Sequence, residues 1–369
     1  MNLSYWEIKA WFTNIDFTVV GSGIVGLSTA LALKEKYPMA TITILEKGVL
    51  PQGASTKNAG FACFGSLTEI LDDLKHHNEQ EVYQLVEKRW NGLHLLRQHL
   101  GDKAIDFKQL GAYELFTDHQ DFEACFAEKE TINQLLKPIF KSDVFTSVNQ
   151  KFNFSNINNK LVFNQFEGQI DTGKMMASLT DLVLQNGVKI LNNITVEDFV
   201  DNGNDVEVKT NITTFKTGKL LVTTNGFANQ LLKEDVQPAR AQVLITKPIE
   251  NLAIRGTFHL DKGYYYFRNI DNRILLGGGR NLDFKAEETS EFGMTNLVND
   301  KLTALLQNTI LPNYKFEIDQ RWSGIMGVGF QKKPIIKQIS DSVSCGVRLG
   351  GMGIAIGFLV GEELADLID

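Results

Sequence analysis

The first regular pattern in the chain is a short apolar strand that leads through glycines into a helix. Apolar and β-branched residues fill Asp16–Val20, and the apolar positions of Leu27–Lys36 have the spacing of a helix that packs on a sheet. A second apolar run, Thr41–Glu46, follows Pro38 and predicts another strand. Strand, helix and strand within about 30 residues form a βαβ unit, which predicts a parallel sheet.

The rest of the chain changes character twice. Thr68–Leu100 has a helical pattern that is polar on one face, whereas residues 240–280 are rich in strands. Near the end, the glycine-rich stretch Leu349–Gly357 predicts a loop, and Phe358–Ile368 predicts a helix. Helical and strand-rich segments therefore occupy different parts of the chain, and the last segment resembles the first in having glycines before a helix.

Length and composition predict a two-domain protein with an ordinary core. The chain has 369 residues, 43% hydrophobic and 22% charged, and roughly 150 residues per domain suggests two domains. The net charge of −7 argues against nucleic acid or an anionic membrane as partners. Cys63, Cys125 and Cys345 form no CxxC pair, which excludes a disulfide framework and a cysteine-rich zinc site.

No secretory signal and no long uninterrupted apolar run is visible, so we predict a cytoplasmic protein without an integral membrane segment. Leu3, Trp6, Ile8, Trp11 and Phe12 could form one apolar face of an N-terminal helix. Such a face suits either packing on its own domain or contact with a membrane surface, and the first is favoured.

The segment between the first strand and its helix, Gly21-Ser22-Gly23-Ile24-Val25-Gly26, matches the pattern GxGxxG. The first glycine allows a tight turn, the second lets the backbone approach a pyrophosphate, and the third lets helix and strand pack closely. Glu46 lies 20 residues after Gly26 (46 − 26), at the end of the second strand, where a carboxylate can bind ribose hydroxyls. These features predict a dinucleotide site, and Glu46 disfavours the extra phosphate of NADP.

The next segment separates the two remaining dinucleotides, NAD and FAD. Gly53–Gly60 carries hydroxyls, a cation, an amide and small residues, which can wrap the far phosphate and reach a flavin ring. With its Gly-Ala-Ser and Asn-Ala-Gly parts, the chain resembles the D-amino-acid-oxidase-like (DAO) family of FAD-dependent oxidoreductases. The resemblance continues through Leu221–Gly226, Pro238–Gln242, Arg273–Gly278 and Trp322-Ser-Gly324.

The resemblance implies a set of cofactor-binding residues, and it places the glycine-rich loop of residues 349–357 against the flavin. The motif and the resemblance together assign to the cofactor Gly21, Ser22, Gly23, Ile24, Val25, Gly26, Glu46, Lys47, Ala54, Ser55, Thr56, Asn58, Ala59, Gly60, Val196, Thr224, Asn225, Gly226, Gly324, Gly350, Gly351, Met352, Gly353 and Ile354. A stripe of small residues for helix packing is the alternative interpretation of the C-terminal glycines.

The family's chemistry implies oxidation of the C–N bond of an amine or amino acid. A neutral amine gives a hydride to flavin N5, and water hydrolyses the resulting imine; oxygen or a respiratory or other acceptor then takes the electrons. We therefore expect no metal and no catalytic Ser-His-Asp set. Since no cysteine lies between Trp322 and Pro334, where monomeric sarcosine oxidases link their flavin, we expect non-covalent FAD.

Four residues are predicted to line the substrate pocket: Tyr265, Phe267, His259 and Met326. Family members that act on α-amino acids place an arginine for the substrate carboxylate where this chain has Met326. The sequence therefore favours the amine-oxidising branch typified by γ-glutamylputrescine oxidase, unless another cation replaces that arginine. Arg268 and Arg280 are candidate cations at the pocket rim.

We expect α/β plus α+β architecture, with a discontinuous Rossmann-like FAD-binding domain and an inserted substrate domain on an antiparallel sheet. The predicted FAD-binding parts are residues 1–90, 150–228 and 320–369, and the substrate-binding parts are residues 91–149 and 229–319. Two alternatives stay open: an FAD-dependent dehydrogenase of a hydroxy acid or polyol phosphate, and a flavin-binding module without turnover.

Overall fold

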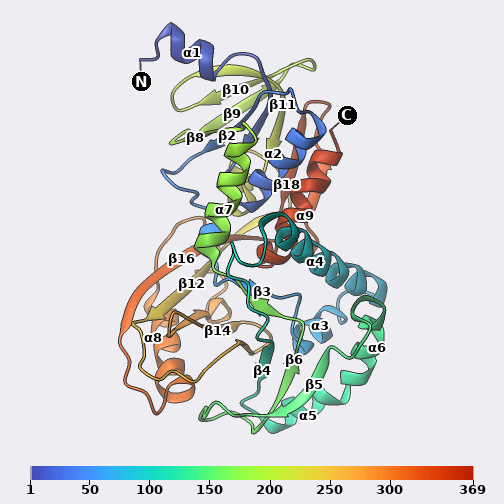
Figure 1. Cartoon of the computed structure of the whole chain (residues 1–369), viewed down its shortest axis with the longest axis vertical. Helices are drawn as coiled ribbons and strands as arrows, with labels where there is room; N and C mark the ends of the chain where they lie inside the picture. Colours follow the sequence, from blue (N-terminus) through green and yellow to red (C-terminus); the bar gives the residue numbers. More distant parts are fainter. Residues whose placement is uncertain (1, 369) are drawn as a thin grey trace.

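The computed structural model describes residues 2–368, which contain two eight-stranded sheets. The sheets lie toward opposite ends of the long axis, and both termini are at the end that carries the first sheet (Figure 1). A two-stranded ribbon of β3 (Phe61–Ala62) and β7 (Gly168–Gln169) completes the β-structure of the described residues.

The first sheet is mainly parallel, as the βαβ pattern predicts. Its strands are β1 (Ile15–Val20), β2 (Ile42–Glu46), β8 (Lys189–Asn192), β9 (Val196–Asp201), β10 (Val206–Thr210), β11 (Thr214–Val222), β17 (Ile335–Gln338) and β18 (Val343–Val347). The order β17-β18-β11-β1-β2-β8 places β1 in the middle, with β2 and β11 parallel on either side. Strands β9 and β10 leave this path as an antiparallel extension of β11.

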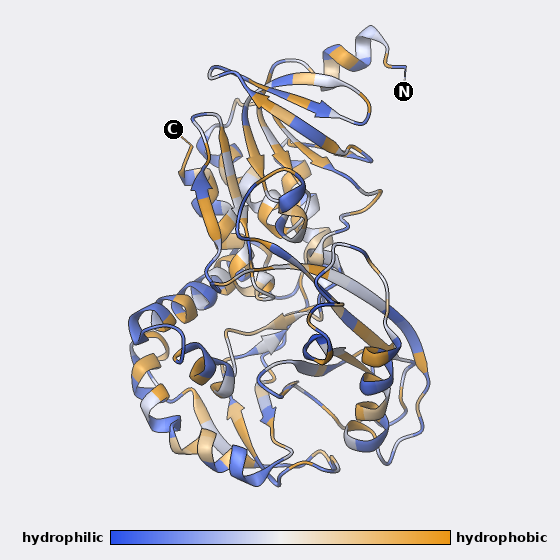
Figure 2. Ribbon diagram, turned by 180° about the vertical axis from the view of Figure 1, so that it is seen from behind, coloured by the Kyte–Doolittle hydropathy of each residue, from blue (hydrophilic) through white to orange (hydrophobic). Residues whose placement is uncertain are grey.

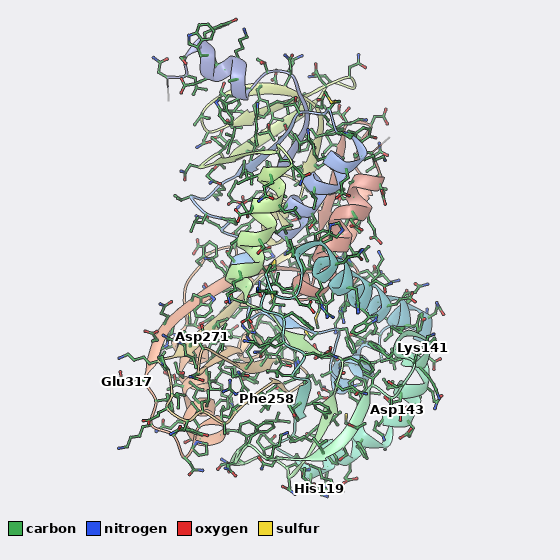
Figure 3. The ribbon with its side chains drawn as sticks, viewed as in Figure 1. His119, Lys141, Asp143, Phe258, Asp271 and Glu317 are labelled. Carbon is green, nitrogen blue, oxygen red and sulfur yellow. The ribbon has the colours of Figure 1, made fainter. Side chains whose placement is uncertain are left out.

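The second sheet is antiparallel except for one pair. Its strands are β4 (Ala112–Leu115), β5 (Phe145–Asn149), β6 (Lys160–Asn164), β12 (Gln237–Thr246), β13 (Thr257–Leu260), β14 (Tyr265–Ile270), β15 (Arg273–Gly278) and β16 (Ile318–Val328). Their order is β16-β12-β15-β14-β13-β4-β6-β5, and β13 and β4 run parallel. One face carries an aromatic core around Phe258, which lies well inside the molecule in Figure 3. The charged residues labelled there, such as Glu317 and Asp271, are at the periphery.

Helices cover the sheets and join them. They are α1 (Tyr5–Trp11), α2 (Ile24–Lys36), α3 (Leu67–Asp73), α4 (Glu79–Leu100), α5 (His119–Ala127), α6 (Lys129–Phe140), α7 (Thr172–Gln185), α8 (Asn296–Leu305) and α9 (Gly353–Asp366), with short turns η1 (Ala54–Thr56), η2 (Asn225–Gln230), η3 (Arg280–Leu282) and η4 (Leu306–Ile310). Helices α2, α7, α9 and α4 contribute with the first sheet to one apolar core. Figure 2 shows apolar residues concentrated along the first sheet and α9.

The C-terminal helix begins earlier than the sequence predicts. We expected it to begin at Phe358, but α9 begins at Gly353, and two glycines inside it allow close packing on α2. A Cβ at Gly357 would lie 2.6 Å from Cγ2 of Ile24, and one at Gly361 would lie 2.8 Å from the backbone nitrogen of Thr29. The alternative interpretation, a stripe of small residues for helix packing, is therefore correct for Gly357, and Gly361, outside that stretch, packs in the same way.

The sheet topology also differs from the predicted domain ranges. Strand β6 falls inside the predicted FAD-binding range 150–228, yet it pairs with β4 and β5 in the second sheet. Strand β16 falls largely inside the range 320–369, yet it pairs with β12 of the second sheet over most of its length. The polypeptide thus passes between the two sheets four times, as these ranges predict, but after β6 and after β16 it does so later in the chain.

The N-terminal helix α1 contacts the rest of the protein through its flanking residues and through Lys189, whose Nζ donates to the Ala10 carbonyl oxygen at 2.7 Å. Phe12 is buried, with its ring 5.5 Å from that of Phe215, and Leu3 packs partly against the same core. Trp6, Ile8 and Trp11 are exposed, at 71%, 40% and 41%. The expected apolar face is thus covered at its ends and open in its middle. No helix within residues 2–368 has the length and apolar character needed to cross a membrane.

The close packing of α2 and α9 gives a stability prediction. Replacing Gly361 by alanine should destabilise the protein by about 1–3 kcal/mol, because its Cβ would press on backbone atoms of α2 that cannot move aside. Gly173→Ala in α7 is the control, because its Cβ would contact only Asp171, at 3.3 Å. Urea unfolding measures both variants; equal midpoints would contradict the packing argument.

Candidate functional site

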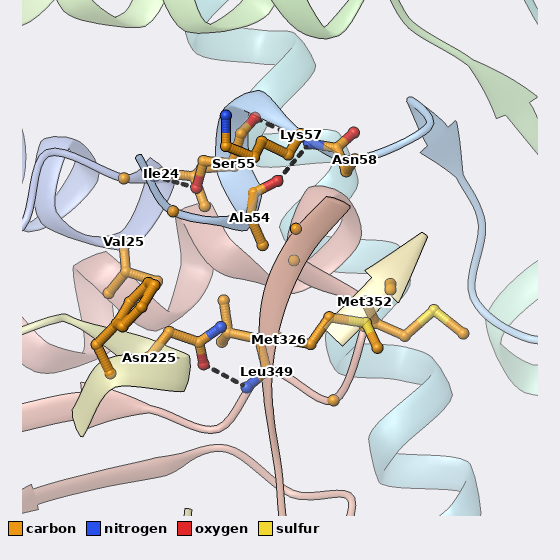
Figure 4. Close-up of a pocket in the computed structure, with 18 of the residues that line it drawn as sticks. Ile24, Val25, Ala54, Ser55, Lys57, Asn58, Asn225, Met326, Leu349 and Met352 are labelled. Carbon is orange, nitrogen blue, oxygen red and sulfur yellow. Dashed lines mark hydrogen bonds between the residues drawn. The ribbon is translucent and has the colours of Figure 1, made fainter. Parts of the chain in front are cut away.

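One large cavity, of about 1020 Å³, is lined by residues of both sheets and their connecting loops. Its size is at the upper end of the range of small-molecule sites, about 300–1,000 Å³. Residues from the turn before α2, from the loop around η1 and from the turn before α9 form one end (Figure 4). Residues of β12, β13 and the β14–β15 hairpin form the other, so a ligand in the cavity contacts both parts of the protein.

The turn between β1 and α2 has the geometry of a phosphate site. Gly21 has φ +102°, and a Cβ at Gly26 would lie 1.9 Å from the carbonyl oxygen of Gly21, so both positions require glycine. The capping residue Gly23 has no side chain that could accept hydrogen bonds from the first amides of α2. Ser55 Oγ accepts one such bond, from Ile24 N at 2.9 Å. The positive end of the α2 dipole therefore faces the cavity.

Glu46 is held rigidly at the end of β2. One carboxylate oxygen accepts hydrogen bonds from Ser22 N and Ser22 Oγ, at 3.1 and 2.7 Å, and the other accepts from Gly48 N and Gln52 N. The side chain is only 5% exposed yet lines the cavity. Ser22 itself does not line the cavity, so it acts on a ligand through Glu46.

Asn58 shapes the loop that follows β2. Its Nδ2 donates to the carbonyl oxygens of Ala54 and Ser55, its Oδ1 accepts from Gly60 N, and the Thr172 hydroxyl donates to the same oxygen at 2.9 Å. Because these contacts occupy the amide, the loop is preformed along the cavity wall.

A second helix begins at the same cavity. Gly350 and Gly351 have φ of +59° and +85°, and α9 begins two residues later without a side-chain cap. Asn225 Oδ1 accepts from Arg348 N and Leu349 N, at 3.0 and 3.2 Å, which fixes the approach to this turn (Figure 4). The cavity is therefore bounded by the positive ends of two helix dipoles.

The opposite wall of the cavity includes part of a row of paired residues across the second sheet. Glu114 on β4 pairs with His259 on β13, which pairs with Tyr266 on β14, which pairs with Gly277 on β15. A Cβ at Gly277 would lie 2.5 Å from the Tyr266 ring, so this glycine makes room for the tyrosine. Of the four, His259 and Tyr266 line the large cavity.

The predicted pocket residues Tyr265 and Phe267 are on the other face of β14. Both are buried in the aromatic core of the second sheet, and neither lines the cavity. Tyr264 and Tyr266 line it instead, because alternate residues of a strand point to opposite faces and an error of one position exchanges them. The other two predicted pocket residues, His259 and Met326, do line the cavity.

Most residues predicted to bind the cofactor also line this cavity. They are Gly21, Gly23, Ile24, Val25, Glu46, Lys47, Ala54, Ser55, Asn58, Ala59, Val196, Thr224, Asn225, Gly324, Gly350, Gly351, Met352, Gly353 and Ile354. Ser22, Gly26, Thr56, Gly60 and Gly226 do not line it. Gly60 and Gly226 serve close packing, because a Cβ would lie 2.5 Å from the Ile170 carbonyl oxygen and 2.6 Å from that of Met326.

Sequence reasoning missed several residues of the cavity wall. Phe61, Glu69 and Phe227 line it, among others. Phe61 and Phe227 directly follow motifs that the sequence did identify, so adjacency was an available signal. Glu69 on α3 had no such signal, because the fold brings it to the cavity from the helical segment.

Of the two arginines predicted at the pocket rim, only Arg280 lines the cavity. Arg268 is 2% exposed, its Nη1 donates to the Gly60 carbonyl oxygen at 3.4 Å, and burial lowers its pKa to about 10. Arg280 makes no ion pair or side-chain hydrogen bond within residues 2–368, although it stacks 5.0 Å from the ring centre of Phe284. Burial lowers the pKa of Arg280 as well.

Two other cavity cations near the second sheet, Lys262 and Lys332, have acidic neighbours. Lys262 lies 3.8 Å from Asp72, and Lys332 pairs with the buried Asp73. Cys63 also lines the cavity, with its sulfur 3.7 Å from that of Met352, and burial raises the pKa of its thiol well above the usual value. Within residues 2–368, no three His, Cys, Asp or Glu side chains are grouped as metal ligands.

Known proteins share both the sequence pattern and the fold. A curated relative, the "probable oxidoreductase OrdL" of Haemophilus influenzae, is 23% identical over 370 residues, covering 96% of this chain and 82% of its own. L-proline dehydrogenase from P. horikoshii superposes with a TM-score of 0.76 at 20% identity, covering 96% of this chain and 93% of its own. Glycine oxidase from Geobacillus kaustophilus gives 0.75 at 16% identity, covering 96% and 95%.

Iminodiacetate oxidase from Chelativorans sp. BNC1 has a TM-score of 0.74 at 17% identity, with 95% of this chain and 94% of its own covered. These three solved structures show the common fold. The model of the DAO family, described as FAD dependent oxidoreductase, matches residues 16–367, which is nearly the whole chain. The sequence motifs, the two-sheet fold and this match together show that the chain belongs to the DAO family of FAD-dependent oxidoreductases.

Proposed function

We propose that the protein oxidises the C–N bond of an amine or amino acid, with FAD in the large cavity and the substrate against the second sheet. The observation that carries the proposal is that one cavity joins two helix N-termini, which suit a dinucleotide, to a polar and aromatic sheet face. FAD, when bound, supplies the two-electron chemistry that no side chain of the chain provides.

The residues present fit FAD along the whole length of the cavity. The turn before α2 suits the pyrophosphate, Glu46 suits the adenosine ribose, and Val196 lines the wall beyond it. The uncapped start of α9 suits the edge of the flavin where negative charge develops on reduction. Non-covalent binding is supported by Cys63, because burial raises the pKa of its thiol and disfavours the nucleophilic thiolate.

The charges of the second-sheet wall favour an amine over a polyol phosphate. A phosphate dianion needs clustered cations without carboxylate partners. Here Lys262 and Lys332 have aspartate neighbours, and Glu69 and Asp72 themselves line the wall. Arg280 lines the cavity and has no carboxylate partner within residues 2–368, so it is available for an anionic group of the substrate and can replace the arginine that is absent at Met326.

Within this proposal the protein binds and orients the substrate and excludes water from it. Tyr264 and Tyr266 present aromatic edges and hydroxyls, and burial raises the pKa of Tyr266 to about 12, so its hydroxyl stays protonated and can donate. The related proteins are consistent with this substrate class, since their names specify proline, glycine and iminodiacetate as substrates.

The first prediction tests the reaction class. Under anaerobic conditions, primary or secondary amines or amino acids should bleach the yellow absorbance of the FAD-bound protein, because they reduce the flavin. Polyamines, N-methyl amino acids, D-amino acids, L-amino acids and hydroxy acids make up the panel, and absorbance at the flavin band is the measurement. Bleaching by hydroxy acids alone would replace the proposal with its alternative, and no bleaching by any compound would indicate a module without turnover.

A second prediction concerns Glu46. Glu46→Gln should weaken FAD binding by about 10- to 100-fold. The carboxylate accepts four hydrogen bonds from protein groups on its two oxygens, whereas an amide has one accepting oxygen and cannot also accept from a ribose hydroxyl. Titration of the FAD-free protein with FAD, followed by flavin fluorescence, gives the dissociation constant. Glu207→Gln on β10, outside the cavity, is the matched control, and equal affinity in the two variants would refute the role of Glu46.

A third prediction concerns Arg280. Arg280→Met should raise the KM for amines that carry a carboxylate by about 10- to 100-fold, because the hydrogen bond from the guanidinium to the carboxylate is lost. The KM for amines without a carboxylate should stay nearly unchanged. Steady-state kinetics with a matched pair, an amino acid and its decarboxylated amine, make the comparison. Arg321→Met, an exposed residue on β16, controls for loss of charge. A similar change in KM for both substrates would show that Arg280 does not bind the carboxylate.

A further inference from the structure

His259 lies between the large cavity and a small one that polar and apolar side chains line together. The small cavity, of about 10 Å³, is lined by His259, Glu114, Glu167, Ser66 and Asn164, among others. His259 is 5% exposed and belongs to the walls of both cavities. Among the described residues that line the two cavities, His259 alone is common to both, so it lies between a group in the large cavity and the buried carboxylates behind it.

The imidazole of His259 is oriented by a buried carboxylate. Its Nε2 lies 3.5 Å from Oε2 of Glu167, and neither atom has another partner. The other oxygen of Glu167 accepts from Phe64 N at 3.0 Å and Gly65 N at 3.2 Å, which fixes this carboxylate. Nδ1 of His259 makes no hydrogen bond to any residue of the range 2–368.

The surroundings of His259 are strongly acidic. Glu167 lies before β7, Glu114 is opposite on β4 and accepts from Ser66 and Thr68, and Glu69 approaches from α3. Arg89 on α4 is a buried cation in this region, but its Nη1 donates to the Phe64 carbonyl oxygen and not to a carboxylate.

These charges act on the His259 ring. Burial alone would lower the pKa of His259, but the carboxylate of Glu167, with Glu69 and Glu114, outweighs it and raises the pKa. Tyr266 is the neighbour on β14 and stays neutral, as does the Cys63 thiol, because burial raises the pKa of each.

An amine substrate needs a proton acceptor at this wall. Free amines are protonated near neutral pH, whereas loss of hydride from the α-carbon requires the nitrogen lone pair. A general base must hold the proton that it accepts, and a neighbouring carboxylate favours the charged form of an imidazole.

We propose that His259 accepts the proton that the substrate ammonium group must lose, and that Glu167 positions the imidazole and stabilises its charged form. In this step an N–H bond of the ammonium breaks, its electron pair stays on the substrate nitrogen, and an N–H bond forms at Nδ1 of His259. The role of His259 rests on the proposed amine oxidation and adds the residue that prepares the amine.

The test uses the FAD-bound protein and the variants His259→Gln and Glu167→Gln. In His259→Gln, the anaerobic rate of flavin reduction at pH 7 should fall by about 100- to 10,000-fold and recover at high pH, where the amine is already neutral. In the wild type, the rate should also rise with pH as His259 loses its proton, and this rise should be absent from the variant. His76→Gln, which changes an exposed histidine, is the control. An unchanged rate and pH profile in His259→Gln would overturn the proposal.

A second measurement needs no turnover and does not depend on the His259 variant folding. NMR titration of histidine-labelled protein should show one imidazole with a pKa above the usual value of about 6.5, and Glu167→Gln should lower it. An ordinary pKa in both proteins would also overturn the proposal. If no amine reduces the wild-type flavin, the proposed function fails, whereas reduction with an unchanged profile in His259→Gln refutes the role of His259 alone.

Discussion

The close packing of α2 against α9 is the constraint on which the rest of the structure depends. Glycines at 357 and 361 let the two helices approach until side chains and backbone of α2 occupy the space of a missing Cβ. Because the helices lie side by side on the first sheet, both begin at one cavity, although more than 300 residues separate them in sequence. The two positive dipole ends at this place make the cavity suitable for a phosphate-containing and electron-accepting cofactor.

The second sheet contributes a different kind of surface to the same cavity. A row on three adjacent strands combines the imidazole of His259 and the phenol of Tyr266, which line the cavity, with the buried carboxylate of Glu114 behind them. Such a row can bind an amine and hold a proton, which are tasks that a flavin does not perform. The division of work proposed for this oxidoreductase therefore follows the division into two sheets: the first binds the cofactor, and the second prepares the substrate.

The cofactor side of this site could be predicted from sequence because each of its motifs is a short run of consecutive residues. GxGxxG, the acidic end of β2 and the loop after it each depend on local backbone geometry, so their spacing carries the information. The substrate side could not be predicted in the same way. Tyr266 and not Tyr265 faces the cavity because of strand register, which single-residue counting along an aromatic run does not determine.

Which of the two arginines is buried could not be predicted from the sequence either. Arg268 and Arg280 have the same side chain and lie twelve residues apart (280 − 268), yet one is enclosed beneath Gly60 and the other lines the cavity. Strand β14 carries Arg268 under the loop after β2, whereas Arg280 follows the glycines at 278 and 279, both with positive φ, which turn the chain toward the cavity. Only the tertiary arrangement distinguishes these two environments.

A crystal structure of the FAD-bound protein with an unreactive amine would test the central claim most directly. The account predicts the pyrophosphate at the start of α2, the flavin ring between the start of α9 and the second sheet, and the amine nitrogen within hydrogen-bonding distance of His259. A flavin ring or an amine bound away from the row that contains His259 and Tyr266 would contradict it.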